Sequence, residues 1–284
     1  MVIVATRASE LRVRFLLVRR TPPGLGPVLT EVYERLCDRG VTVDDVIPEE
    51  QLLSTEELAV RHDLYVLKSH TELALSTAGT LCALGARLLN PHQGCLLTQD
   101  KITSTKLLSD AGVPVPRSWV TDDYARLLPL LREGPLIAKP HRGHLGRGIH
   151  VLRRAKDLEL LSSADGPFLF QRYLETGGED VKAYVVGGRV FAVTKRFSSA
   201  SYRLHGTPIE LDAGTRDTVL RCGRVLRLYL YGVDLVRTER GAYVVDVNYF
   251  PGYKGVPGAA KLIADYVYQY AVAGPRPVLE GAAL

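Results

Sequence analysis

Two apolar segments near the end of the chain, YGVDLVRT (231–238) and AYVVDVN (242–248), each carry an acidic residue where a buried strand should be apolar. The connection Glu239-Arg240-Gly241 is short enough to predict an antiparallel hairpin. In that hairpin Asp234 lies directly opposite Asp246. Two ionised carboxylates facing each other on adjacent strands repel, and burying them in a valine-rich sheet is costly.

A third oxygen-bearing side chain belongs to the same face. Asn248 points the same way as Asp246, because strand side chains alternate with a period of two. A divalent cation removes the repulsion, and two carboxylates with one amide oxygen form a ligand set expected for Mg²⁺. The alternative is a solvated face on which Asp234 caps a turn. We predict a metal site at Asp234, Asp246 and Asn248.

The composition allows a large core and restricts the choice of partners. The chain has 284 residues, of which 46% are hydrophobic, and its length permits one to three domains. It has no apolar run of about 18 residues and no recognisable signal peptide, so we expect no membrane association. The net charge of +5 suits a small anionic substrate, whereas the basic runs are too short to predict nucleic-acid binding. Four cysteines without CxxC spacing indicate reduced thiols and a cytoplasmic protein. The sequence leaves the oligomeric state open between a monomer and a homodimer.

Strand and helix signals alternate over the first 90 residues, which predicts an α/β domain with a parallel sheet. From Pro91 onward the pattern changes to strands joined by short turns, with a helix over 98–112 that begins at a Thr98 cap. Hairpins and a helix follow, and Gly187-Gly188 marks the turn of one hairpin. We therefore expect three parts: an N-terminal α/β domain (1–92), a central subdomain (93–173) and a C-terminal antiparallel subdomain (174–284).

A glycine-rich turn follows the apolar strand PLIAKP (135–140). The chain lacks the GxxxxGK[ST] motif of a P-loop. Glycines let backbone N–H groups approach an anion closely, and Lys139 stands just before the turn. Lys101, at the start of a helix, can add a second positive charge. The alternative for the glycine-rich segment is an ordinary hairpin turn, and the alternative for Lys101 is a solvated lysine on the helix surface. The turn residues of interest are Gly143, His144, Gly146, Arg147 and Gly148.

The order of these parts resembles the ATP-grasp superfamily over roughly residues 95 to 265. A lysine-bearing helix is followed by a strand with lysine, a glycine turn and a Q-x-x-L linker, then by a D-x-K strand and the Asp…Asp-x-Asn pair. The segments KAYVVGGRVFAVTKRFS (182–198) and DVNYFPGYKGV (246–256) are most similar to inositol tris/tetrakisphosphate kinases. The glutamate-adding carboxylate–amine ligases of the same superfamily are nearly as similar, since they share the Asp-x-Asn…Pro-Gly ending.

The resemblance implies an ATP-grasp fold with a central lid subdomain, and a site for ATP with two Mg²⁺ ions. ATP would contact Lys101, Lys139, Gly143, Gly146, Gly148, Gln171, Arg172, Tyr173 and Leu174, the last four beside adenine. The reaction centre would include Lys182, Lys195, Arg196 and His144. The second substrate would contact Arg19, Arg20, Lys68, His70, His144, Asn248, Gly252 and Lys254. The basic residues in this second-substrate set could instead be ordinary charged residues of the protein surface.

The same resemblance implies a kinase that phosphorylates an inositol phosphate or another polyanion. Its alternative is a carboxylate–amine ligase, which forms an acylphosphate and then an amide with an amino acid. A binding protein without catalysis is disfavoured, because both lysines and the metal-ligand set are intact. The kinase is our prediction, because the segments around the two hairpins match it better.

Overall fold

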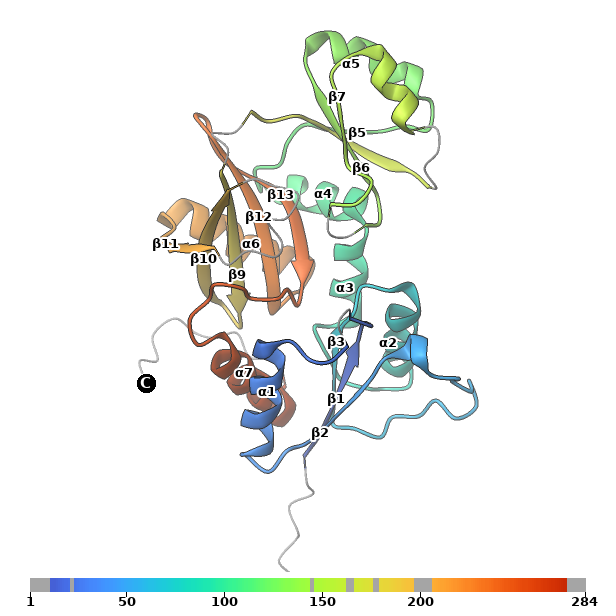
Figure 1. Ribbon diagram of the computed structural model, residues 1–284, viewed down its shortest axis with the longest axis vertical. Helices are drawn as coiled ribbons and strands as arrows, with labels where there is room; N and C mark the ends of the chain where they lie inside the picture. The colour runs from blue at the N-terminus through green and yellow to red at the C-terminus, as the bar shows by residue number, and fades with distance from the viewer. Residues whose placement is uncertain are drawn as a thin grey trace, which may run out of the picture. The chain divides into compact units, whose positions relative to one another are not determined.

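The computed structural model describes residues 11–20, 23–143, 146–161, 166–175, 179–196 and 206–274 (Figure 1). The side chains of residues 179, 195 and 196 lie outside this description. The chain divides into two compact units, one formed by residues 1–92 with 258–277 and the other by residues 93–257 with 278–284. Each unit has its own sheets and core.

The first unit contains a four-stranded sheet in the order β2-β1-β3-β4. All three strand pairs are parallel, which confirms the predicted α/β type. Its elements are β1 (Arg12–Leu17), α1 (Pro27–Cys37), β2 (Thr42–Val46), the 3₁₀ turn Pro48–Glu50, β3 (Leu64–Lys68), α2 (Glu72–Ala83), β4 (Leu88–Leu89) and α7 (Ala259–Ala273).

Helix α7 groups with this first unit, not with the segment 174–284 to which the sequence assigned it. The hydroxyl of Tyr270 donates to the Leu88 carbonyl at 3.1 Å, and the Arg87 guanidinium donates to the Ala271 carbonyl at 2.9 Å. The apolar face of α7, which includes Ile263 and Val267, is buried. The C-terminal helix therefore completes the core of the N-terminal sheet.

The second unit begins with helices and a four-stranded antiparallel sheet in the order β5-β8-β6-β7. Phe168 and Phe170 pack in its core with Leu136 and Leu152. The elements of this part are α3 (His92–Gln99), α4 (Lys101–Asp110), β5 (Ser118–Val120), the 3₁₀ turn Tyr124–Leu127, α5 (Leu128–Glu133), β6 (Leu136–Pro140), β7 (His150–Leu152), the 3₁₀ segment Ala155–Leu161 and β8 (Phe168–Arg172).

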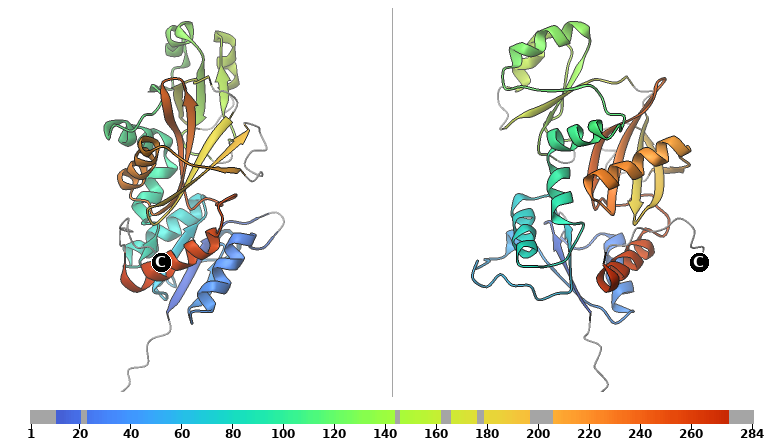
Figure 2. Two further views of the ribbon diagram at one scale, coloured as in Figure 1. Left: turned by 90° about the vertical axis from the view of Figure 1, so that its left-hand side faces the viewer. Right: turned by 180° about the vertical axis from the view of Figure 1, so that it is seen from behind.

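A five-stranded antiparallel sheet, in the order β11-β10-β9-β12-β13, completes the second unit. The predicted turn at Gly187-Gly188 is confirmed, with φ of 56° and 98° at the two glycines. Helix α6 lies along this sheet (Figure 2), and the Tyr231 hydroxyl donates to the Val219 carbonyl at 3.0 Å. The elements are β9 (Glu179–Val186), β10 (Arg189–Arg196), β11 (Thr207–Ile209), α6 (Ala213–Leu226), β12 (Leu230–Thr238) and β13 (Gly241–Tyr249).

The helix predicted over 98–112 is in fact two helices, α3 and α4, that meet at Asp100. The Asp100 carboxylate caps α4 by accepting from the backbone N–H groups of Ile102 and Thr103. Thr98 instead donates its hydroxyl to the Gly94 carbonyl inside α3. The predicted cap was wrong because aspartate accepts these bonds equally well and stands next to the helix start.

The cysteines and the membrane-spanning potential of the helices were also considered in the sequence predictions. The four cysteines are free thiols, Cys37 and Cys82 exposed and Cys95 and Cys222 buried. Among the described residues, no helix combines the length and the apolar character needed to span a bilayer.

Candidate functional site

A row of charged side chains crosses three strands of the five-stranded sheet. Asp246 of β13 pairs with Asp234 of β12, which confirms the predicted facing pair, and Asp234 pairs in turn with Lys182 of β9. Asn248 lies opposite Gly232, two residues along the same strands. Side chains with this spacing share one face of the sheet. This face of β9, β12 and β13 is the candidate site.

The hairpin has the predicted pairing of Asp234 with Asp246, but its turn and its strand register differ from the prediction. Thr238 pairs with Gly241, so the turn has two residues and not the predicted three. The register then shifts between Asp234 and Leu235, and Val245 is the extra residue of a β-bulge. The bulge restores the facing of Asp234 and Asp246. It also leaves the Val245 carbonyl outside the ladder, where it accepts a hydrogen bond of 2.9 Å from the Lys139 ammonium.

Lysines already neutralise both carboxylates. The Lys101 Nζ lies 2.7 Å from Asp246 Oδ1, and the Lys182 Nζ lies 2.8 Å from Asp234 Oδ1. Lys101 and Lys139 are buried, at 8% and 6% exposure. The repulsion that the sequence suggested is therefore relieved by ammonium groups within the chain itself.

The electrostatics of the site favour an ionised Asp246. Burial acts to raise the pKa of Asp246, but the charges of Lys101 and Lys139 outweigh it and the pKa is lowered. Asp234 is the main cause that raises the pKa of Lys182. Lys139 differs from Lys182, because burial lowers the pKa of Lys139 to about 8 although the charges of Asp246 and Asp234 oppose the change. Burial thus disfavours the charged form of Lys139, and an anionic ligand would favour it.

The oxygen atoms fit a hard divalent cation. Asp234 and Asp246 retain 29% and 28% side-chain exposure, so both remain accessible beside their lysines. The Asn248 amide nitrogen lies 3.4 Å from Asp246 Oδ2. The third predicted metal ligand, Asn248, is therefore next to Asp246. No cluster of three acidic, histidine or cysteine side chains suited to a metal occurs in the described part of the chain. A cation here would therefore depend on the amide oxygen and on oxygens from its ligand or from water.

The segment after β13 folds back over this face. Pro251 lies over Gly232, where an added Cβ would be 3.1 Å from the Pro251 Cγ. The segment is held by Tyr253, whose ring packs 5.5 Å from that of Tyr184 and whose hydroxyl donates to the Val185 carbonyl. Gly232 is a site residue that the sequence analysis missed, although a glycine two positions before Asp234 in an apolar strand was the available signal. Exposed Gly252 and half-buried Lys254 follow in the same segment.

The glycine-rich turn lies close to the start of α4. The backbone N–H of Lys101 donates to the His141 carbonyl at 2.8 Å. Gly146 and Gly148 both have a φ of 70°, a conformation that favours glycine. Gly143 belongs to the same turn, whereas His144 lies outside the described residues. The structure thus brings Lys101, Lys139 and this turn together near Asp246, as a phosphate site requires.

The predicted adenine segment has one buried orphan atom. Gln171 is 1% exposed, and its Oε1 has no hydrogen-bond partner among the described residues. The backbone N–H groups of Arg172 and Tyr173 are used by the Arg117 and Pro135 carbonyls, while Leu174 follows directly. The Arg172 guanidinium donates to the Gly134 carbonyl and so has a structural role. A ligand donor is the natural partner for Gln171.

Four of the predicted residues belong to the other unit. Arg19 and Arg20 follow β1, Lys68 ends β3, and His70 comes two residues later. Burial and the neighbouring Arg20 lower the pKa of Lys68 to about 8. Arg19 pairs with Glu50 at 2.7 Å. Lys195 and Arg196 end β10, but their side chains lie outside the described residues.

Comparisons with known proteins point to one family. A family model for the RimK-like ATP-grasp domain matches residues 98–266. A relative from Xanthomonas oryzae pv. oryzae (strain MAFF 311018), named "Probable alpha-L-glutamate ligase", is 32% identical over 190 residues, 62% of this chain and 64% of that protein. The match thus spans less than two thirds of the relative's length.

Solved structures share the fold. A RimK domain ATP-grasp protein from Sphaerobacter thermophilus DSM 20745 matches with a TM-score of 0.74 and 21% identity, over 90% of this chain and 99% of that one. The ATP-grasp ligase PsnB, solved with a minimal precursor, Mg and ADP, matches with a TM-score of 0.65 and 22% identity, over 90% and 97% of the two chains. The predicted ATP-grasp fold is confirmed.

The predicted inositol phosphate kinase is wrong. The similar curated proteins are named as ligases that act on glutamate, and the matching family model is RimK-like. The hairpin and post-turn segments that favoured the kinase form the sheet and the loop at the candidate site, which both enzyme classes need. The findings support the alternative, a carboxylate–amine ligase.

Proposed function

The chain belongs to the RimK-like ATP-grasp family, and we propose from this that it is an ATP- and Mg²⁺-dependent carboxylate–amine ligase. A substrate carboxylate oxygen attacks the γ-phosphorus of ATP, which gives an acylphosphate and releases ADP. An amine then attacks the acyl carbon, so that phosphate leaves, an amide forms and the amine loses a proton. The observation that carries the proposal is the similarity to proteins named alpha-L-glutamate ligase, which makes L-glutamate the first amino acid to test.

The geometry of the second unit suits the first step. Lys101 and Lys139 lie next to the glycine-rich turn and offer two ammonium groups to a polyphosphate. A Mg²⁺ ion at Asp234, Asp246 and Asn248, or a pair of ions, would neutralise charge on the phosphates when bound. Lys182 stands beside Asp234 and would stabilise negative charge on the reacting carboxylate. Lys195, Arg196 and His144 remain candidates for the same role.

The second substrate of the proposed reaction is anionic, because it carries a carboxylate. Gly252 and Lys254 follow the segment that covers Gly232 and are our candidates for contacting it in this unit. Four basic residues at the carboxyl ends of β1 and β3 are candidates in the other unit, since ligands of open parallel sheets bind at that edge. They are Arg19, Arg20, Lys68 and His70.

The proposal is tested by supplying MgATP, L-glutamate and a set of peptides that end in glutamate. We expect ADP formation that needs the carboxylate, and a product one glutamate heavier by mass spectrometry. Hydroxylamine in place of the amine should trap the acylphosphate as a hydroxamate, which does not require the natural amine to be known. Transfer of labelled phosphate to a stable ester instead of free phosphate would contradict a ligase.

Gln171 gives a separate test of nucleotide recognition. Its buried Oε1 needs a donor, and the exocyclic amino group of adenine supplies one, whereas hypoxanthine presents an acceptor there. We expect wild type to prefer ATP over inosine triphosphate, and Gln171→Leu to reduce that preference by about tenfold. Gln171→Glu, which keeps the acceptor oxygens, is the matched control. Equal preference in wild type and Gln171→Leu, measured by titration calorimetry, would remove Gln171 from the adenine site.

A further inference from the structure

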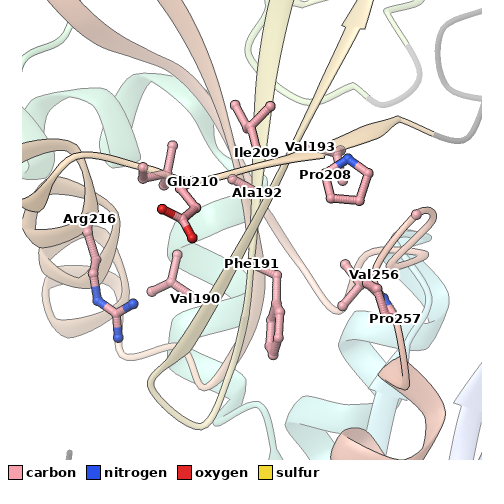
Figure 3. Close-up of a pocket in the computed structure, with 12 residues that line it drawn as sticks. Val190, Phe191, Ala192, Val193, Pro208, Ile209, Glu210, Arg216, Val256 and Pro257 are labelled. Carbon is pink, nitrogen blue, oxygen red and sulfur yellow. The ribbon is translucent and has the colours of Figure 1, made fainter.

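A pocket of about 410 Å³ lies at the outer edge of the five-stranded sheet (Figure 3). One wall is formed by β10 and β11, and the other by Val256 and Pro257 after β13. Its volume lies within the range of small-molecule sites, about 300–1,000 Å³. The charged row at Asp234 and Asp246 is not part of its lining.

The pocket exists because β11 is short. β11 pairs with β10 only from Ala192 to Thr194, so Val190 and Phe191 have no neighbouring strand on that side. The chain leaves the sheet at Glu210 and turns into α6. These features are backbone geometry, so the pocket is built into the fold and does not depend on one side-chain rotamer.

A glycine contact separates the pocket from the candidate site. A Cβ on Gly255, whose φ is 85°, would lie 2.9 Å from the Gly206 carbonyl oxygen. A Cβ on Gly206 would lie 2.6 Å from Val193. The segment after β13 is therefore pressed against β10 at this point. Its residues Pro251 and Lys254 belong to the candidate site, while Val256 and Pro257 line the pocket.

The lining defines the chemistry of a ligand. Its apolar residues, including Val190, Phe191 and Ile209, suit an aliphatic or aromatic group. Glu210 and Arg216 lie together on the side of the pocket next to α6 (Figure 3). One acid and one base give no net charge, which disfavours a polyphosphate and suits a zwitterion.

We propose that this pocket binds a free apolar α-amino acid, such as leucine or phenylalanine. The side chain enters between Val190, Phe191 and Val256, the carboxylate meets Arg216 and the ammonium group meets Glu210. This goes beyond the ligase reaction, because the pocket lies outside the charged row. A bound amino acid bridges the sheet edge and the segment that carries Lys254.

The test is calorimetric titration of the full chain with L-leucine and L-phenylalanine. Leucinamide, which lacks the carboxylate, and 4-methylpentanoate, which lacks the ammonium group, report on the two ends of the zwitterion, and glycine reports on the apolar part. We expect saturable binding of leucine or phenylalanine in the presence of MgATP, and at least about tenfold weaker binding of all three analogues.

Variants locate the site. Arg216→Gln should weaken leucine binding by at least about tenfold, and Val190→Trp, which fills the pocket, should abolish it. Arg221→Gln is the matched control: Arg221 lies on the same helix, pairs with Asp217 at 2.6 Å and does not line the pocket, so this variant should bind as wild type. Unchanged ATP binding shows that each variant is folded. Absence of leucine and phenylalanine binding, displacement by MgATP, or unchanged binding in Val190→Trp overturns the proposal.

Discussion

Replacing Asp246 with asparagine is expected to lower amide formation by about 10²–10³-fold, the range for losing one preorganised electrostatic contact to reacting charges. The carboxylate stands at the centre of the site, opposite Asp234 and 2.7 Å from the Lys101 ammonium. It stays ionised because Lys101 and Lys139 outweigh the effect of burial and keep its pKa low. Asparagine preserves the shape but removes the charge that would hold a cation. Steady-state ADP release measures the loss.

The same change should also affect stability, because Lys101 is buried and would lose its charged partner. We expect the free energy of unfolding to fall by about 1–3 kcal/mol. Asp110→Asn is the matched control: Asp110 pairs with Lys106 on exposed α4 positions, so that change should cost at most about 0.5 kcal/mol and leave turnover intact. Normal turnover in Asp246→Asn would show that the cation binds elsewhere.

The sequence predicted which residues face each other better than it predicted how they do so. Alternation of apolar residues assigns Asp234 and Asp246 to one face of their strands, and the assumed turn length set them opposite each other. The bulge at Val245 cannot be read from that pattern, because valine suits both a regular and a bulged position. An assumed three-residue turn gave the correct register only because the bulge compensates for a turn of two residues.

The lysine contacts show what periodicity alone leaves out. Lys101 and Asp246 are 145 residues apart in the sequence, so no local pattern reports their ion pair. Opposed carboxylates therefore indicated a missing positive charge, while the structure supplies part of that charge from α4 and β9. The metal site at Asp234, Asp246 and Asn248 stays a prediction, whereas the two lysine contacts were not predictable from the strand pattern.

The choice between kinase and ligase failed for a related reason. Lys101, Lys139, Asp234, Asp246 and Asn248 are the proposed polyphosphate and metal residues, and both candidate reactions begin with attack on the same phosphorus. Residues that meet the second substrate must distinguish a hydroxyl from a carboxylate, and both groups attract the same lysines and arginines. The charge pattern of this chain therefore predicts an ATP site and leaves the acceptor open.

Replacing Lys139 with methionine is expected to weaken nucleotide binding by about 10–100-fold, since a buried charge-assisted contact to phosphate is lost. Methionine keeps most of the apolar stem, so the core around β6 stays filled. Lys106→Met, on the exposed face of α4, removes the same charge and should leave affinity unchanged. Calorimetric titration with a non-hydrolysable ATP analogue and Mg²⁺ measures both. Equal affinity of Lys139→Met and wild type would exclude Lys139 from the phosphate site.

The role of Lys139 can also be tested by pH, because its titration should change protein stability and nucleotide affinity in opposite directions. Burial lowers the pKa of Lys139 in the folded protein to about 8, from an ordinary value of 10.5. Above about pH 8 the folded chain without ligand loses this proton, while the unfolded chain keeps it until about pH 10.5. The contribution of Lys139 to the free energy of unfolding therefore rises with pH across that window. Nucleotide affinity should fall across the same window, because phosphate binds the charged form. Both slopes should disappear in Lys139→Met relative to wild type, and slopes that persist in that variant would assign them to another group.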